Sequence, residues 1–337
     1  MKSFLKVCCR GFTFLVVIGA LALAAGAYWA HEKFHGKGPL EESTLITIER
    51  GAHIGSVSNM LSDKGVISDS LIFKYMAKFT GQAEKIKAGE YQLQSYMSMK
   101  EVLDLLEGGK VVQRQITIRE GLTVYEIEQL LINNTELEKQ STDLGVPEGY
   151  LLPETYSYAQ GDSTADIINR MANALEKVLD EAWVNRAEGL PIKTKEEALV
   201  LASIIEKETA VPSERRRVAG VFTNRLRIGM LLQTDPTVIY AITKGKHKND
   251  GKGPLGRRLL KKDLKFDSPY NTYLYAGLPP KPICNPGKAS IEAALNPEEH
   301  KYLYFVADGT GGHAFGKNLA EHNSNVAKWR KIRKQQN

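Results

Sequence analysis

The chain has 337 residues, of which 42% are apolar and 25% charged, a composition typical of a folded protein of about two domains. Its 29 glycines and 13 prolines are too few for a collagen-like or low-complexity polymer, and three cysteines exclude a small disulfide-stapled domain. The net charge of +6 includes Lys2, Lys6 and Arg10, so the rest of the chain is nearly balanced and does not indicate nucleic-acid binding. Cys284 is the only thiol beyond the first apolar run, so an oxidising compartment is allowed but not required.

The first predicted element is a transmembrane helix over residues 11–30. This run of twenty residues carries no charge, and at about 1.5 Å per residue it would span the roughly 30 Å of a bilayer core. Basic residues precede it, and Tyr28 and Trp29 lie at its far end, where aromatic rings favour the headgroup region. We therefore expect residues 1–10 to form a cytoplasmic tail. A cleaved signal peptide is the alternative, although its apolar segment is usually shorter.

An internal repeat follows the apolar run. Residues 46–61 (ITIERGAHIGSVSNML) and 116–131 (ITIREGLTVYEIEQLL) align without a gap at a constant offset of 70. Each copy begins with the alternation of a strand, turns at a glycine and continues with apolar residues at helical spacing. In the second copy Thr123 and Glu126 predict a capping box at the start of the helix.

The stretch between the two copies predicts a further strand and helix. Residues 91–94 alternate as a strand does, and Ser98 with Glu101 predicts a capped helix that ends at a glycine pair. Residues 44–131 are thus predicted to form a small α+β region that resembles a LysM module, a glycan-binding unit. A packing scaffold without a ligand explains the same pattern.

The second region, residues 147–330, is predicted to be a mainly helical α+β domain. Thr194 and Glu197 predict a helix start, and residues 198–205 (ALVLASII) are apolar almost all round, as in a buried helix. Glu206 and Glu208 follow at its C-terminal end, where cations are more usual than anions. Burial raises the pKa of a carboxyl group toward the value that a general acid needs at neutral pH. An exposed helix end with solvated acids is the alternative.

The residues after this helix predict further helices, a basic segment and a strand, but their pattern indicates no particular function. A helix is predicted from Ser213 to Gly229, and Asp235 is expected as the N-cap of another. Residues 244–265 are strongly basic, which is typical either of a solvated loop or of a rim that attracts an anionic polymer or lipid headgroups. Residues 301–306 predict a strand that turns back toward 314–315.

Four motifs in this order resemble those of the YceG/MltG family of endolytic murein transglycosylases: LASIIEKETAVPSE, FTNRLRIGMLLQTDPTVIY, SPYNTYLYAGLPPKPICNPG and YLYFVADGTGGHAF. The resemblance covers nearly the whole chain. It implies an α+β enzyme of the bacterial inner membrane, with a periplasmic catalytic domain and no cofactor or metal. It also implies cleavage of MurNAc–GlcNAc bonds inside nascent glycan strands with formation of 1,6-anhydro-MurNAc ends, which would terminate elongation. Peptidoglycan is then the substrate, and penicillin-binding proteins are the expected partners.

The resemblance also implies site residues. The family's catalytic Glu precedes a small hydroxyl residue, which matches Glu208 and Thr209 rather than Glu206. Its signature segments supply candidates for substrate binding: Gln233, Thr234, Tyr270, Asn271 and Tyr273. The family often has Asp where this chain has Glu154. A single carboxyl group would suffice if the 6-hydroxyl of the sugar replaced water, whereas ordinary glycosidases use two.

Two alternatives remain at this stage. One is an anchored binding scaffold without catalysis, and the other is a conventional hydrolase with Glu154 as a second carboxylate. Other chemistries find little support, because the sequence contains no HExxH or Cys-x-x-Cys metal spacing, no G-x-S-x-G elbow and no P-loop. His313 is expected to be a loop residue.

Overall fold

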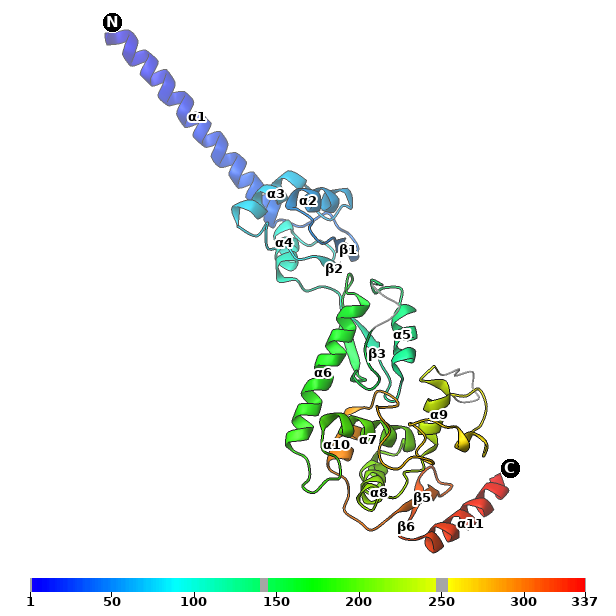
Figure 1. Ribbon diagram of the computed structural model, residues 1–337. Helices are drawn as coiled ribbons and strands as arrows, with labels where there is room; N and C mark the ends of the chain where they lie inside the picture. The colour runs from blue at the N-terminus through cyan, green and yellow to red at the C-terminus, as the bar shows by residue number, and fades with distance from the viewer. Residues whose placement is uncertain (1, 140–144, 247–253, 337) are drawn as a thin grey trace. The chain divides into compact units, whose positions relative to one another are not determined.

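The computed structural model describes residues 2–139, 145–246 and 254–336, with the side chains of 2–12 and 336 left out. The protein divides into two compact units, Met1–Arg114 with Ala159–Gly161 (unit 1) and Gln115–Tyr158 with Asp162–Asn337 (unit 2). The described elements are mostly helical, with three short two-stranded sheets (Figure 1). The mixed α+β architecture is therefore confirmed.

Helix α1, Lys2–His35, contains the expected apolar run and is longer than predicted at both ends. Within it, Thr13–His35 is long and apolar enough to cross a membrane, and its apolar 18-residue window is not buried inside the protein. A membrane anchor and a signal sequence share these properties. Near the end of α1, Phe34 is only 1% exposed and packs in the core of unit 1, so the helix continues directly into folded structure.

Unit 1 is a small α+β fold beyond α1. Its elements are β1 (Thr44–Ile48), α2 (Ile54–Asp63), α3 (Ser70–Phe79), β2 (Gly89–Leu93) and α4 (Met99–Gly108). Strands β1 and β2 pair antiparallel with Ile48 opposite Gly89, and the buried faces of the strands and helices share one core. The predicted capping box of Ser98 and Glu101 is present at the start of α4.

The second copy of the repeat belongs to unit 2. There β3 (Arg114–Thr117) pairs with β4 (Thr155–Tyr158), and α5 (Val124–Ile132) and α6 (Thr164–Val184) complete a core around Ile127 and Met171. Thr123 and Glu126 form the predicted capping box. The two copies thus lie in different compact units, and the LysM resemblance of residues 44–131 stays a prediction.

Helix α7, Lys195–Glu208, lies at the centre of the larger core of unit 2. Every side chain from Ala198 to Ile205 is buried, as its apolar circumference predicts. Burial of each Leu or Ile contributes about 1.5–3 kcal/mol, so this packing fixes the position of the helix end. The described elements that follow are η1 (Pro212–Glu214), α8 (Arg215–Arg227), α9 (Asp235–Thr243), η2 (Asp263–Lys265), α10 (Lys288–Leu295), β5 (Tyr304–Ala307), β6 (His313–Gly316) and α11 (Leu319–Gln336).

Two sequence-based expectations need correction in this part of the chain. Thr234, not Asp235, is the N-cap residue of α9, and Asp235 is the first helical residue. His313 is not a loop residue but begins strand β6, opposite Ala307. Of the basic segment 244–265, residues 247–253 lie outside the described part of the chain.

Candidate active site

The candidate site forms where α7 ends. Thr209 has extended backbone (φ −140°), which stops the helix at Glu208, and its buried hydroxyl accepts a hydrogen bond from Val211 N at 3.0 Å. Glu208 is partly buried, and its Oε1 accepts a short hydrogen bond from the Thr234 hydroxyl. Among the described residues, nothing hydrogen-bonds to Oε2 of Glu208. One carboxylate oxygen is therefore held, and the other is available to a ligand.

The environment of Glu208 keeps a proton on it near neutral pH. Burial raises the pKa of Glu208 from 4.5 to about 7, against the opposing hydrogen bond from Thr234. The negative charge of Asp235 raises the pKa further, whereas the positive charges of His313 and Arg225 lower it. The raised pKa lets Glu208 hold a proton close to neutral pH, as a general acid requires.

The backbone around Thr234 is fixed by two neighbouring threonines. Gln233 has a left-handed backbone (φ 49°) and donates its N–H to Thr272 O at 3.0 Å, and Thr234 N–H donates to Thr272 Oγ1 at 3.1 Å. The Thr237 hydroxyl bonds both Thr234 O (2.8 Å) and Thr272 Oγ1 (2.9 Å). This buried network aims the Thr234 hydroxyl at Glu208.

Asp235 and Tyr273 form the next pair. The Tyr273 hydroxyl donates to Asp235 Oδ1 at 2.7 Å, and burial, with the bond to Asp235, raises the pKa of Tyr273 above its usual value. Asp235 is exposed. It is the carboxylate whose charge acts on Glu208, a role that the sequence analysis did not assign to it.

A histidine and a carboxylate from distant parts of the chain also meet here. His313 Nδ1 lies 2.7 Å from Glu214 Oε2, and His313 N–H donates to Glu214 Oε1 at 2.9 Å. The two side chains are 17% and 13% exposed. Because Glu214 accepts from Nδ1–H, the imidazole orientation is fixed. Sequence reasoning missed this pair, since 99 residues separate its members and no local spacing signals it.

Arg225 stabilises the backbone next to the site. Its guanidinium donates to Leu303 O (2.7 Å) and Leu232 O (2.6 Å), so it ties the segment before Thr234 to the residue that precedes strand β5. Arg225 is 7% exposed, and burial lowers its pKa. The Arg225 guanidinium thus binds backbone carbonyl groups, and we assign it no contact with the substrate.

The five predicted substrate-binding residues lie in different settings. Gln233 is exposed, whereas Thr234 and Tyr273 are bonded as described above. Tyr270 is half-buried with its ring 5.0 Å from that of Tyr240. Asn271 is fully buried, and its amide donates to Leu264 O (3.0 Å) and Phe266 O (2.8 Å). Asn271 therefore braces its own loop, and its side-chain donors are already used.

The two other acids considered from the sequence are placed differently from Glu208. Glu206 accepts a hydrogen bond from Gly287 N–H at 3.0 Å and lies 3.9 Å from Arg215, so it is a paired structural group. Glu154 is exposed, and its charge acts on Glu120 and Tyr156.

A further buried acid was missed. Burial raises the pKa of Glu148 to about 7, and its Oε1 accepts from Val124 N–H (2.9 Å) and Asn285 Nδ2 (3.1 Å). Its other oxygen lies 3.4 Å from the Tyr240 hydroxyl. Glu148 thus joins α5, α9 and the segment before α10. Within the described ranges, no cluster of three or more His, Cys, Asp or Glu side chains is arranged to hold a metal ion.

Comparison with known proteins places the chain in a family. The model of the YceG-like family matches residues 46–328. The chain belongs to the YceG-like family. It is 34% identical to the endolytic murein transglycosylase of Bacillus subtilis strain 168, over 84% of each chain. It is 28% identical to that of Streptococcus pneumoniae strain D39, over 94% of this chain and 65% of the other.

A solved structure agrees with the family assignment. The crystal structure of a yceG-like protein from Listeria monocytogenes is 33% identical in sequence and superposes with a TM-score of 0.51. The match covers 84% of this chain and 99% of that one.

Proposed function

We propose that this member of the YceG-like family is an endolytic murein transglycosylase in which Glu208 is the catalytic acid and base. The observation that carries the proposal is a carboxyl group whose pKa is raised to about 7 at the end of a buried helix, with one oxygen held by Thr234. The similarity to two curated enzymes of that name supports the choice of substrate.

In the first step, protonated Glu208 donates its proton to the glycosidic oxygen between MurNAc and GlcNAc. The bond from C1 of MurNAc to that oxygen breaks, and the GlcNAc residue leaves with the proton as a hydroxyl group. Positive charge develops at C1, so the nascent Glu208 carboxylate stabilises it electrostatically. The Thr234 hydroxyl, which donates to Oε1, stabilises the same carboxylate.

In the second step, the Glu208 carboxylate accepts the proton of the MurNAc 6-hydroxyl as O6 closes on C1. The product end is a 1,6-anhydro ring, and no water is consumed. Glu208 returns to its protonated form, so a single carboxyl group serves both steps. A pKa near 7 suits both roles, because the group must be able to lose and regain a proton at neutral pH.

The surrounding side chains fill supporting roles in this proposal. Asp235, held by Tyr273, raises the pKa of Glu208, and Arg225 and His313, which is held by Glu214, act in the opposite direction. Exposed Gln233 and half-buried Tyr270 and Tyr273 would contact the sugars. Asn271 would act only by shaping its loop.

The cellular setting is part of the proposal. An apolar helix preceded by basic residues would anchor the protein in the bacterial inner membrane, with a short cytoplasmic tail and the remainder in the periplasm. Glycan strands emerging from synthases such as penicillin-binding proteins would then be within reach, and cleavage would terminate their elongation. Residues 44–131 would form the LysM-like region of the enzyme, and unit 1 contains the part of it up to Arg114.

Glu208→Gln and Glu206→Gln form a matched pair that tests the assignment. Both substitutions replace a carboxyl group at the end of α7 with an amide, and Gln at 206 can still accept from Gly287 N–H. We expect the Glu208 variant to release no anhydro-ended fragments from purified glycan strands, and the Glu206 variant to retain most of the activity. Undiminished release by Glu208→Gln would exclude Glu208 as the acid.

A conventional hydrolase is the alternative function, because a second carboxylate lies near Glu208. Glu154 is exposed, and Asp235 is the carboxylate whose charge raises the pKa of Glu208, so Asp235 is the second carboxylate that a hydrolytic mechanism would use. Product mass separates the two reactions, because a hydrolytic end is one water heavier than an anhydro end.

A further inference from the structure

The outer face of helix α3 carries three large apolar side chains that the described part of the protein leaves exposed. Leu71, Tyr75 and Phe79 are 61%, 62% and 87% exposed. They follow one another at a spacing of four residues, so they form one line along the helix, which we call the apolar stripe. The buried residues of α3, Phe73 and Ala77, lie on the opposite side and pack in the core of unit 1. Grouped apolar side chains on a surface are typical of a site that a partner or a membrane covers.

The charged residues of α3 are both basic. Lys74 and Lys78 lie on this helix, whose sequence SLIFKYMAKF contains no acidic residue. Lys74 Nζ lies 5.8 Å from the centre of the Tyr75 ring, so this cation sits beside the apolar stripe. Asp69 precedes the helix as its N-cap and accepts from the N–H groups of the first turn at 2.9 and 3.0 Å. An apolar and aromatic face with lysines beside it is typical of a helix that lies in the headgroup region of a membrane.

The position of α3 next to α1 indicates what covers the stripe. The two helices contact each other, and Figure 1 shows α3 beside the C-terminal end of α1. Trp29 is the last aromatic residue of the apolar run, and Phe34 already packs in the core of unit 1. The helix rises only about 8 Å between these two residues, at about 1.5 Å per residue. Unit 1 therefore begins at the headgroup depth of any bilayer that α1 crosses, and α3 is among the elements nearest to it.

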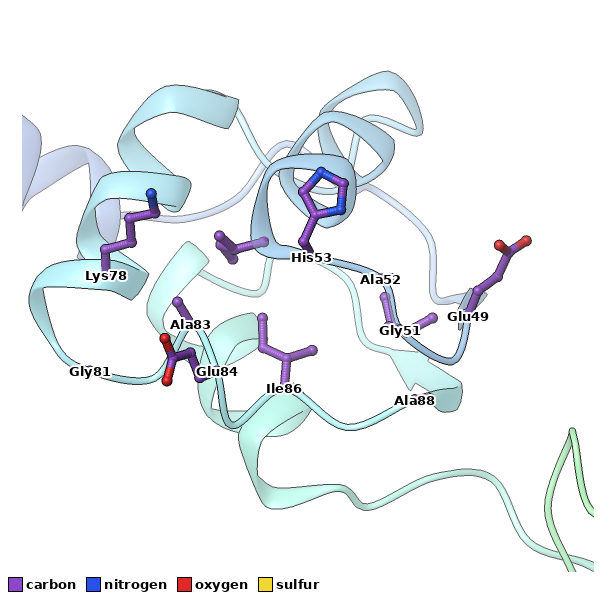
Figure 2. A pocket seen from close by; sticks show the side chains of 12 residues that line it. Glu49, Gly51, Ala52, His53, Lys78, Gly81, Ala83, Glu84, Ile86 and Ala88 are labelled. Carbon is purple, nitrogen blue, oxygen red and sulfur yellow. The ribbon is translucent and has the colours of Figure 1, made fainter.

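The apolar stripe is separate from the cavity of unit 1. Figure 2 shows this cavity, of about 870 Å³, between the turn around Gly51 and the segment from Gly81 to Ala88. Of helix α3, all of which the structure describes, only Lys78 lines the cavity. A ligand in the cavity would thus leave the apolar stripe uncovered, so the stripe needs a contact of its own.

We propose that the apolar stripe of α3 lies in the headgroup region of the membrane that α1 spans, against anionic lipid. This inference rests on the proposed membrane anchor. Tyr75 and Phe79 enter the depth that aromatic rings favour, and Lys74 and Lys78 contact lipid phosphates. Because α1 already holds unit 1 at the bilayer surface, the contact forms at a high effective concentration and needs little intrinsic affinity. Two points of attachment then restrict the rotation of unit 1 about α1.

A matched pair of cysteine variants measures whether the stripe is covered. Leu71→Cys places a thiol in the stripe and keeps both aromatic rings, whereas Leu45→Cys places one on β1, which lies farther from the start of α1 than α3 does (Figure 1). Both are made in the full-length protein with Cys8→Ser and Cys9→Ser, and Cys284 is buried and does not react. The protein is placed in nanodiscs of phosphatidylglycerol and phosphatidylcholine, one copy to a disc. The rate of modification by a membrane-impermeant maleimide is then measured.

We expect the thiol at position 71 to react about tenfold or more slowly than the thiol at position 45, although Leu71 is the more exposed of the two leucines (61% against 46%). Adding Phe79→Glu, at an exposed position of the stripe, should restore fast reaction at position 71, whereas Gln92→Glu, on exposed β2 surface, should not.

Three results would overturn the proposal. They are equal reaction of the two thiols in discs that contain the protein, protection that survives Phe79→Glu, and protection that appears only in discs with two copies, which would show contact between copies. Protein that does not co-elute with the discs would refute the anchor and the proposal together. Release of anhydro-ended fragments by the parent and by Glu208→Gln is measured separately, so a failure of the proposed catalysis is distinguishable from each of these results.

Discussion

Replacing Thr234 with valine isolates the hydrogen bond that tunes the candidate acid. Valine keeps the shape of threonine and removes only the hydroxyl that donates to Glu208 Oε1. That bond favours the charged carboxylate, so its loss raises the pKa of Glu208 above the value of about 7. If protonated Glu208 is the acid, activity falls as pH rises through this pKa, and the variant moves that fall to higher pH.

The size of the shift follows from the strength of such a bond. A hydrogen bond to a charged group contributes about 1.5–3 kcal/mol, and one pKa unit corresponds to about 1.36 kcal/mol. Part of the bond survives in the protonated state, where the threonine hydroxyl still has an oxygen to contact. We therefore expect the basic limb of the pH–rate profile to move up by about one unit.

The assay is release of soluble fragments from purified glycan strands over a range of pH. Thr237→Val is the matched control, because it removes an equally buried hydroxyl that contacts Thr234 O and Thr272 rather than Glu208. The control should lower stability and move the basic limb less than Thr234→Val does, because it loosens the network around Thr234 but leaves the hydroxyl that donates to Glu208. A limb that stays in place in Thr234→Val, or moves equally in both variants, would refute the role of Thr234 in tuning Glu208.

Further predictions concern charge and stability. Asp235→Asn removes the negative charge that raises the pKa of Glu208 and should move the basic limb to lower pH, whereas His313→Gln should move it to higher pH; shifts of the same sign would contradict this electrostatic picture. Because the pKa of Glu208 is raised on folding, ionising this group destabilises the folded protein, and the free energy of unfolding falls as pH rises from about 4.5 to 7. Glu208→Gln avoids this loss, so thermal unfolding should show the variant more stable than the parent by about 3 kcal/mol at pH 8 and equally stable at pH 4. Glu148→Gln keeps the acceptor for Val124 N–H and Asn285 Nδ2 and should be at least as stable as the parent at pH 8, while Glu148→Ala should lose about 2–3 kcal/mol; equal losses would argue that the acceptor is unimportant. Asn271→Ala should lower the free energy of unfolding by about 2–3 kcal/mol through its loop, and an unchanged unfolding midpoint would contradict its bracing role.

The local signals of the sequence predicted local structure well. The capping boxes at Ser98 and Thr123 are present, because both members of each box lie within one helical turn. The apolar circumference of residues 198–205 correctly predicted a buried α7, since a helix without a polar face has no side to turn toward water. At Asp235 the expected cap was displaced by one residue, because its carboxylate pairs with Tyr273 instead of the helix N-terminus.

Contacts between distant segments could not be predicted in this way. The pair of Glu214 and His313 and the bonds around Glu148 join residues that no periodicity relates. Family motifs supplied Thr234 as a site residue but not its function as a donor to Glu208. Asn271 was proposed from the same motif, although its amide is used within its own loop. A motif thus indicates which residues lie near a site. The hydrogen bonds in the structure then distinguish residues that can contact a ligand from residues that stabilise the surrounding loops.

The origin of the new oxygen at the cleaved MurNAc end tests the central claim most directly. Purified glycan strands are digested with the parent protein and with Glu208→Gln in water enriched in oxygen-18, and the released fragments are weighed by mass spectrometry. We expect fragments from the parent to be one water lighter than a hydrolytic product and free of the heavy isotope, and the variant to release none. Isotope incorporated at C1 of MurNAc would show that water, not the 6-hydroxyl of the sugar, attacks in this protein.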